Sequence, residues 1–117
     1  MKASSVGTYL RFLRRKSGLS QRELARIIGN VTASQISRHE RSVTPPSLLN
    51  AFGYQSVFQQ PASEIFPGLY HTVEAGVEER LEAFERELGN STAIGRSALP
   101  VARQLEWLWE RKNPESV

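Results

Sequence analysis

At 117 residues the chain is long enough for one domain, or for one domain with an appendage. It contains no Cys, which excludes a disulfide framework, a Cys zinc site and thiol chemistry. It has no apolar run of signal-peptide or membrane-spanning length, so we expect a cytoplasmic protein that does not enter a membrane.

The net charge of +3 is unevenly distributed along the chain. Residues 1–60 carry nine Lys or Arg against two Glu, whereas residues 61–117 carry six against ten Glu. A basic first half suggests a polyanionic partner such as DNA, and an acidic second half argues against DNA contact along its length. Ordinary solvated surfaces would explain both halves equally well.

The first predicted helix spans Thr8–Lys16 and ends at Gly18, a residue that adopts the left-handed conformation readily. Cations fill its second half, where they suit the helix dipole. Its predicted apolar stripe has helical spacing and consists of Val6, Tyr9, Leu10 and Leu13.

The second predicted helix spans Ser20–Ile28 and has a capping box, because Ser20 is followed three residues later by Glu23. Gly29 and Asn30 then form a turn, since both residues tolerate positive φ. The side chains expected to face a core are Leu24, Ile27 and Ile28. A second capped helix so soon after this turn indicates a helix-turn-helix.

The third predicted helix, residues 32–41, is the element on which the functional prediction depends. Thr32 and Gln35 form another capping box, and Val31 and Ile36 occupy the positions of a hydrophobic staple. Only Ile36 is clearly apolar in this helix. One face is small, polar and cationic and consists of Ala33, Ser34, Ser37 and Arg38. A helix with so thin a face can approach the major groove of DNA closely.

Two further helices are predicted in the first half of the chain, Ser47–Phe58 and Pro61–Phe66, after a proline-containing loop over Ser42–Pro46. Gly53 weakens the first of them by about 1 kcal/mol relative to Ala. The side chains expected to point inward are Leu48, Leu49, Phe52 and Phe58, followed by Ile65 and Phe66. Pro67 and Gly68 are expected to close this part of the chain.

Two amphipathic helices are predicted in the second half, His71–Leu88 and Leu99–Lys112, joined by a Gly/Ser/Thr-rich linker over Gly89–Ala98. The apolar stripe of the first consists of Val73, Val77, Leu81, Phe84 and Leu88, and that of the second of Val101, Leu105, Leu108 and Trp109. The first stripe either forms a dimer interface or packs on the rest of the monomer. Trp107, which lies off the second stripe, and Trp109 either bury within the monomer or form a partner surface.

Residues 8 to about 66 resemble the Cro/C1-type (also called Xre-type) helix-turn-helix family of phage and bacterial repressors. The resemblance rests on Leu19–Ala25, Gly29, Ile36–Arg41, Pro46–Leu48 and Ser63–Phe66. It implies a five-helix domain that binds operator DNA, commonly as a dimer, and regulates transcription. Two features depart from the family pattern. The turn Gly29–Val31 is one residue longer than is most common, and His39 stands where an apolar residue is usual.

The resemblance also implies contacts to the bases of DNA. Ala33, Ser34 and Arg38 match positions that typically reach base edges, and Ser37 lies beside them. Arg38 can donate two hydrogen bonds to guanine, worth about 1–3 kcal/mol of discrimination. The alternative is an ion pair with Glu40 or a phosphate contact for Arg38, and an ordinary role at the helix start for Ala33 and Ser34.

Phosphate contacts are expected from a second set of residues, Gln21, Arg22, Thr32, Arg41 and Thr44. The resemblance implies this role for Gln21, which begins the second helix, and for Arg41 and the loop through Thr44. Ordinary solvation is the alternative for Gln21. Glu40 is expected to face inward and pair with Arg14, Arg26 or a backbone amide, and His39 either packs half-buried or contacts a phosphate.

The sequence therefore predicts an all-α fold: a five-helix repressor-like DNA-binding domain, residues 1–68, and a C-terminal two-helix extension, residues 69–117. We expect a transcriptional regulator or repressor that binds double-stranded DNA as a homodimer, with residues 32–41 in the major groove of a two-fold operator. The alternative is an antitoxin or accessory subunit with autoregulatory DNA binding. Its partner protein would bind through Val77, Leu81, Phe84, Leu88, Trp107 and Trp109.

We expect no enzyme, no cofactor and no metal site. His39 and His71 are the only histidines and lie far apart in the sequence. No nucleophile elbow, phosphate-binding loop or zinc-ligand spacing is present. The acidic residues are all Glu, and most of them lie on one predicted solvated helix.

Overall fold

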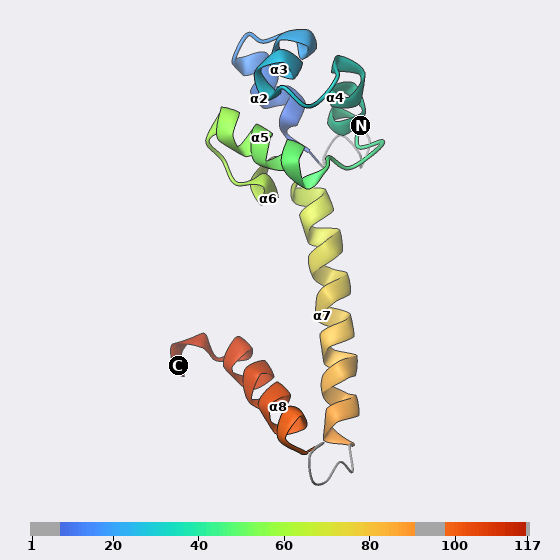
Figure 1. Ribbon diagram of the computed structural model, residues 1–117, viewed down its shortest axis with the longest axis vertical. Helices are drawn as coiled ribbons and strands as arrows, with labels where there is room; N and C mark the ends of the chain where they lie inside the picture. Colours follow the sequence, from blue (N-terminus) through green and yellow to red (C-terminus); the bar gives the residue numbers. More distant parts are fainter. Residues whose placement is uncertain (1–7, 91–97, 117) are drawn as a thin grey trace. The chain divides into compact units, whose positions relative to one another are not determined.

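The computed structural model describes residues 8–90 and 98–116, and all regular structure in these residues is helical (Figure 1). The predicted all-α fold is therefore confirmed. The chain divides into two compact units, residues 1–73 and 74–117, and the division falls inside the longest helix.

Five helices, α2 to α6, form the first unit together with the start of α7 (Figure 1). They are α2 (Leu10–Lys16), α3 (Gln21–Ile28), α4 (Ala33–Glu40), α5 (Leu48–Phe58) and α6 (Ala62–Ile65). The predicted boundaries agree to within two residues. The largest shift is at α2, where Thr8 lies outside the helix and its Oγ1 accepts a hydrogen bond from the Leu10 amide at 3.1 Å.

Local chemistry explains where these helices begin and end. The Ser20 hydroxyl accepts from the Glu23 amide at 3.0 Å, and the Glu23 carboxylate accepts from the Ser20 amide at 2.9 Å, which is the predicted capping box. Gly18 and Gly29, which follow α2 and α3, have φ of +77° and +90°. This left-handed conformation is costly for any residue with a Cβ, so both turns require glycine.

The core of the first unit is a single cluster of large side chains from all five helices or their ends. Its buried members are Leu10, Leu13, Leu24, Ile36, Tyr54, Ile65 and Phe66. Among the members predicted from the first two helices, Tyr9 and Ile27 are wrong, since they are 52% and 55% exposed. Tyr9 precedes α2, where its amide donates to the carbonyl of Ile65 at 2.7 Å. Val6 lies outside the described residues.

The inward face of α5 differs most from the prediction. Leu48, Leu49 and Phe52 were expected in the core, but they are 69%, 68% and 54% exposed. Instead, Tyr54 is fully buried, and Phe58 packs partly buried against the core as expected. Apolarity alone favoured the leucines, whereas a hydrogen-bonding partner in another helix favours the tyrosine.

A close approach of α3 and α5 explains the glycine in the middle of α5. A Cβ added to Gly53 would lie 2.9 Å from Ile28 Cδ1 and 3.1 Å from Ile28 Cγ2. Ile28 therefore occupies the space that a larger residue would need. The loss of helix propensity at Gly53 is offset by this packing.

Pro67 and Gly68 do not form the predicted break before the long helix, because α7 (Pro67–Gly89) begins at Pro67 and runs through both residues. Proline suits the first position of a helix, where its missing N–H would have no helical partner. A Pro-Gly pair is typical of the end of an element, although the same proline also suits the start of a helix.

The second unit contains the rest of α7, α8 (Ala98–Lys112) and a short 3-10 helix, Pro114–Ser116. Ion pairs join α7 to α8: Arg111 donates to Glu78, and Lys112 Nζ lies 2.6 Å from Glu85 Oε1. Residues 91–97 of the predicted linker lie outside the described residues, and its ends, Gly89 and Ala98, belong to helices.

The apolar stripes of the second unit are only partly covered. On α7, Leu81, Phe84 and Leu88 are half-buried, whereas Val73 and Val77 are exposed. On α8, Leu108 is buried and Val101 is half-buried, whereas Leu105 and Trp109 are 36% and 54% exposed. Across residues 8–90 and 98–116, none of the helices combines the length and apolarity of a membrane span.

Candidate nucleic-acid interface

The helix α4 begins with the cap that its sequence predicts. The Thr32 hydroxyl accepts from the Gln35 amide at 3.1 Å, and the Gln35 side chain accepts from the Thr32 amide at 2.9 Å. Ile36 is fully buried, and Val31 packs against the same core, which agrees with the predicted staple. The start and the direction of α4 are thus set by its own first residues.

The two sides of α4 have opposite character. Ile36, His39 and Glu40 are buried on one side. On the other side, Ser34 and Arg38 are exposed, and Ala33 and Ser37 are half-buried. The four side chains predicted to contact bases are therefore together on one helix face that remains open to solvent. The residues that precede Arg38 on this face, Ala33, Ser34 and Ser37, are all small, so a binding partner can come close to the helix backbone there.

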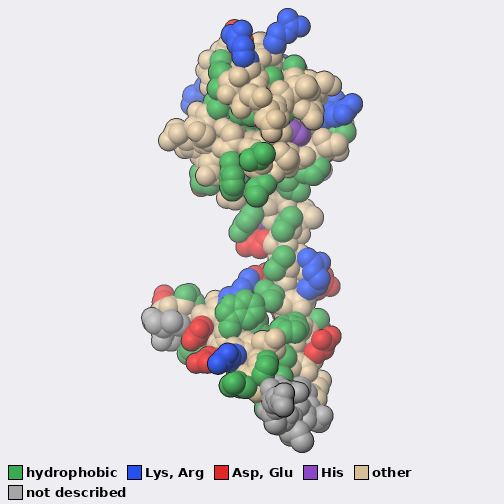
Figure 2. Space-filling model, viewed as in Figure 1, with side chains coloured by type: hydrophobic (Ala, Val, Ile, Leu, Met, Phe, Trp, Pro, Cys, Tyr) green, Lys and Arg blue, Asp and Glu red, His purple; other side chains and the backbone are tan. Residues whose placement is uncertain are grey.

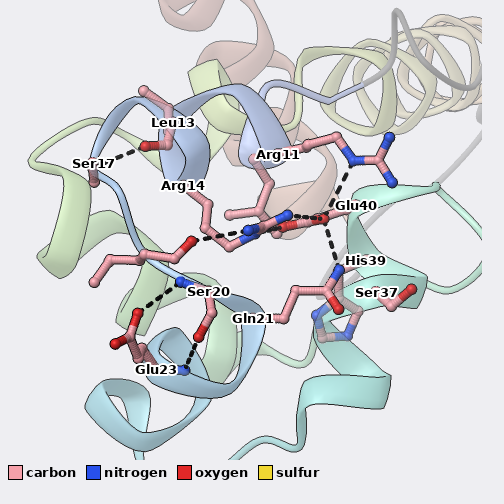
Figure 3. Close-up of polar contacts among 12 residues, drawn as sticks. Arg11, Leu13, Arg14, Ser17, Ser20, Gln21, Glu23, Ser37, His39 and Glu40 are labelled. Carbon is pink, nitrogen blue, oxygen red and sulfur yellow. Dashed lines mark hydrogen bonds and ion pairs between the residues drawn. The ribbon is translucent and has the colours of Figure 1, made fainter.

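Glu40 joins three helices from the buried side of α4. Figure 3 shows Arg11 and Arg14 of α2 and Gln21 of α3 converging on its carboxylate. Arg14 donates through Nε and, at 3.2 Å, through Nη2, Gln21 Nε2 donates at 3.0 Å, and Arg11 Nε lies 3.6 Å away. The predicted inward pairing of Glu40 with Arg14 is confirmed.

Burial and hydrogen bonding shift the pKa of the Glu40 carboxylate in opposite directions. Desolvation would raise the pKa of Glu40, but the hydrogen bonds from Arg14 and Gln21 and the charges of Arg14 and Arg11 outweigh it and hold the pKa below its ordinary value. Glu40 is therefore an anion at neutral pH. Arg14 also donates to the carbonyl of Leu19 at 2.9 Å, so the same guanidinium fixes the segment that leads into α3.

His39 is the second polar group beneath α4. Its Nδ1 lies 2.7 Å from the Tyr54 hydroxyl, and the two rings meet edge to face. Burial lowers the pKa of His39, because the imidazolium form would lose its hydration. The departure of His39 from the family's apolar pattern thus has a structural reason: it packs in the core and gives the Tyr54 hydroxyl a partner. The packing role expected for His39 is confirmed.

The residues expected at phosphates lie around the open face. Arg22, Thr32, Arg41 and Thr44 are exposed, and Arg41 Nε donates to Ser37 Oγ at 3.3 Å. Gln21 is half-buried and its amide group already donates to Glu40. A phosphate at the start of α3 would meet a side chain that is held in place by the core network.

A cationic hollow borders the end of α4. Its volume is about 970 Å³, and it is lined by Thr8, Tyr9, Arg11, Phe12, Arg15, Lys16, Glu40 and Arg41. Figure 2 shows Lys and Arg side chains on the visible face of this unit. Arg11, Arg15 and Lys16 belong to the cations of the first predicted helix, to which the sequence assigns no specific contact. Their grouping with Arg41 depends on how α2 packs on α4, although the helical spacing of Arg11 and Arg15 already put those two on one face.

The comparison with protein families agrees with this geometry. No curated protein and no solved structure matches the chain significantly. Residues 10–65, which contain α2 to α6, match the helix-turn-helix family. That family is one of DNA-binding regulators and is generally not enzymatic. This part of the chain is therefore a helix-turn-helix domain of the Cro/C1 type, in which α3 and α4 form the helix-turn-helix.

Proposed function

We propose that the protein is a sequence-specific transcriptional regulator of the cytoplasm that binds a two-fold operator as a homodimer, with α4 in the major groove. The observation that carries this proposal is the open face of α4, on which Ser34 and Arg38 are exposed and Ala33 and Ser37 are half-buried. Small side chains let the helix backbone approach the base edges. Arg38 then supplies the fork that recognises guanine O6 and N7.

The domain of residues 1–68 has the charge that this role needs, whereas residues 69–117 form the extension. We assign phosphate contacts to Gln21, Arg22, Thr32, Arg41 and Thr44. The cations that line the hollow beside Arg41 extend the same basic surface. Such contacts position the helix without selecting a sequence, and they make affinity fall with salt.

Selection of bound sequences from a random duplex library, at a stated salt concentration, tests the proposal directly. We expect an enriched two-fold motif with half-sites about 34 Å apart. The variant Arg38→Ala should lose about 1–3 kcal/mol of discrimination at one position per half-site. Its matched control, Arg22→Ala, should weaken all sequences evenly and reduce the salt slope by about one. A library without enrichment over the input would count decisively against the proposal.

A second candidate function, an antitoxin or accessory subunit, draws support from the exposed apolar side chains of the second unit. Trp107 and Trp109 are 49% and 54% exposed, and Val77 is 37% exposed. Large aromatic side chains are common anchors of protein interfaces. In this alternative, the stripe of Val77, Leu81, Phe84 and Leu88 and the two tryptophans bind a partner protein, and DNA binding is autoregulatory.

Affinity purification from native lysate separates the two candidates. If the protein is an antitoxin, a partner protein should co-purify with the parent chain in stoichiometric amount. The double variant Trp107→Ala with Trp109→Ala should lose this partner, whereas Arg38→Ala should retain it. Recovery of the homodimer without another protein, for the parent chain, supports the regulator instead.

A further inference from the structure

The cationic hollow at the end of α4 contains aromatic rings to which the proposed function assigns no DNA contact. Tyr9 and Phe12 line the hollow and are 52% and 61% exposed. An exposed cation can contact a phosphate of DNA, but a phosphate offers no apolar surface to an aromatic ring. The two rings therefore indicate a ligand that has a flat apolar part as well as an anionic part.

The positive charge of the hollow is not balanced by the carboxylates of the described residues. Its cations come from α2 and from the end of α4, and they are Arg11, Arg15, Lys16 and Arg41. Glu40 also lines the hollow, but its carboxylate already accepts hydrogen bonds from Arg14 and Gln21. Across residues 8–90 and 98–116, no carboxylate forms an ion pair with Arg15, Lys16 or Arg41. The hollow therefore attracts an anion from outside.

Helical spacing places the cations and the rings of α2 next to each other. Arg11 and Arg15 are four positions apart, so they are neighbours on the helix, and like charges at this spacing repel. Phe12 and Lys16 form the adjacent row, and Lys16 Nζ lies 5.9 Å from the centre of the Phe12 ring. A ligand that bridges Arg11 and Arg15 with an anionic group would relieve the repulsion. The flat part of the same ligand would then lie close to Phe12.

The two arginines nearest Glu40 keep part of their guanidinium groups available. The Arg11 side chain is 50% exposed, and Figure 3 shows its Nε toward Glu40 and its two terminal nitrogens on the far side of the group. Arg41 uses Nε to donate to Ser37 Oγ at 3.3 Å, so its terminal N–H groups can bind an oxyanion. Guanidinium groups match the geometry of phosphate oxygens. Because a phosphate carries several oxygens, it can engage more than one of these cations at once.

The size of the hollow favours a small organic molecule over a simple ion. Its volume is about 970 Å³, and sites for small molecules usually span about 300–1,000 Å³. An inorganic phosphate would fill only a small part of this space and would leave the rings of Tyr9 and Phe12 exposed. A planar base that carries a phosphate group satisfies the rings and the cations together.

We propose that the cationic hollow binds a nucleoside phosphate, whose base stacks on Tyr9 and Phe12 and whose phosphates are held by Arg11, Arg15 and Arg41. Binding of this ligand does not depend on the proposed function. Its consequence for DNA does, because Arg41 is also assigned to a phosphate of the operator. A bound nucleoside phosphate and the operator then compete for Arg41, so each weakens the binding of the other.

Titration calorimetry of the full chain without DNA tests the site. The probe is ADP, used without Mg²⁺ at low salt, and its two halves, adenosine and pyrophosphate, are titrated separately. We expect ADP to bind at least about tenfold more tightly than either half, because only ADP engages both the rings and the cations. Equal affinities for ADP and pyrophosphate would overturn the proposal, since the hollow would then be only a basic surface.

Two variants with matched controls locate the ADP within the hollow. Phe12→Ala removes an exposed ring and should weaken ADP binding by about fivefold or more, whereas Phe52→Ala, an exposed ring of α5, should not. Arg15→Gln should also weaken ADP binding, and Arg26→Gln, an exposed cation of α3 outside the hollow, should leave it unchanged. Circular dichroism checks that each variant is folded. Parent affinity for ADP in both Phe12→Ala and Arg15→Gln would contradict the proposed site.

The outcomes separate this inference from the proposed function. If the chain selects an operator but does not bind ADP, the inference is wrong and the proposed function stands. If the chain binds ADP as expected but selects no DNA sequence, the inference stands and the proposed function is wrong. Where both are found, saturating ADP should weaken operator binding in the parent but not in Phe12→Ala. An operator affinity that ADP leaves unchanged in the parent would overturn the competition for Arg41.

Discussion

The carboxylate of Glu40 holds α2, α3 and α4 together, so its removal is the sharpest test of the fold beneath the recognition helix. Glu40→Gln keeps the size of the side chain but removes the charge that balances Arg14. The two side chains are 0% and 10% exposed, so the guanidinium would remain buried without an anion. Breaking a buried pair in this way costs about 3–5 kcal/mol. For a domain of this size that loss corresponds to a fall in Tm of about 12 °C or more.

Urea and thermal unfolding, followed by circular dichroism and by the ring resonances of buried Tyr54, measure this change. The matched control is Glu78→Gln, which removes the anion of the exposed Arg111 pair and should leave stability close to that of the parent. A loss below about 1 kcal/mol for Glu40→Gln would refute the reasoning, because it is the value of a surface pair. Replacing both partners, Arg14→Met with Glu40→Leu, should recover at least half of the loss, since no unpaired charge is left.

Three further predictions concern the same framework. Gly53→Ala gains about 1 kcal/mol of helix propensity but overpacks Ile28, at a cost of about 1–3 kcal/mol, so urea unfolding should show a net loss that Ile28→Val relieves. Burial lowers the pKa of His39, so as the pH falls the imidazole is protonated in the unfolded chain before it is protonated in the folded chain. The stability contributed by neutral His39 is therefore complete above about pH 6.5, the ordinary pKa of histidine, and declines as the pH falls toward the lowered pKa. An unfolding series from pH 7.5 to 5 should show this slope, and His39→Gln should lack it. Thr32→Ala should cost about 1 kcal/mol by removing the cap of α4, whereas Thr32→Ser should keep most of it in thermal unfolding.

The helices and their ends could be predicted from the sequence, because the interactions that define them are local. Both capping boxes join residues three positions apart, and both glycine turns depend on the conformational freedom of one residue. The thin face of α4 was predictable for the same reason, since helical periodicity decides which side chains share a face. Pro67 shows the limit of this approach, because the same residue type can end one element or begin the next.

Tertiary structure alone decided which face of α5 turns inward. Hydrophobicity favoured Leu48, Leu49 and Phe52, but the helix buries Tyr54, whose hydroxyl meets His39 fifteen positions earlier in the chain. The pair of Arg14 and Glu40 is separated by 26 positions, and the fit of Ile28 against Gly53 joins two helices. The periodicity of a sequence shows which face of a helix is apolar, but it does not show which side chains of other helices will pack against that face. The choice among faces is therefore made when the helices pack and each buried polar group must find a hydrogen-bonding partner.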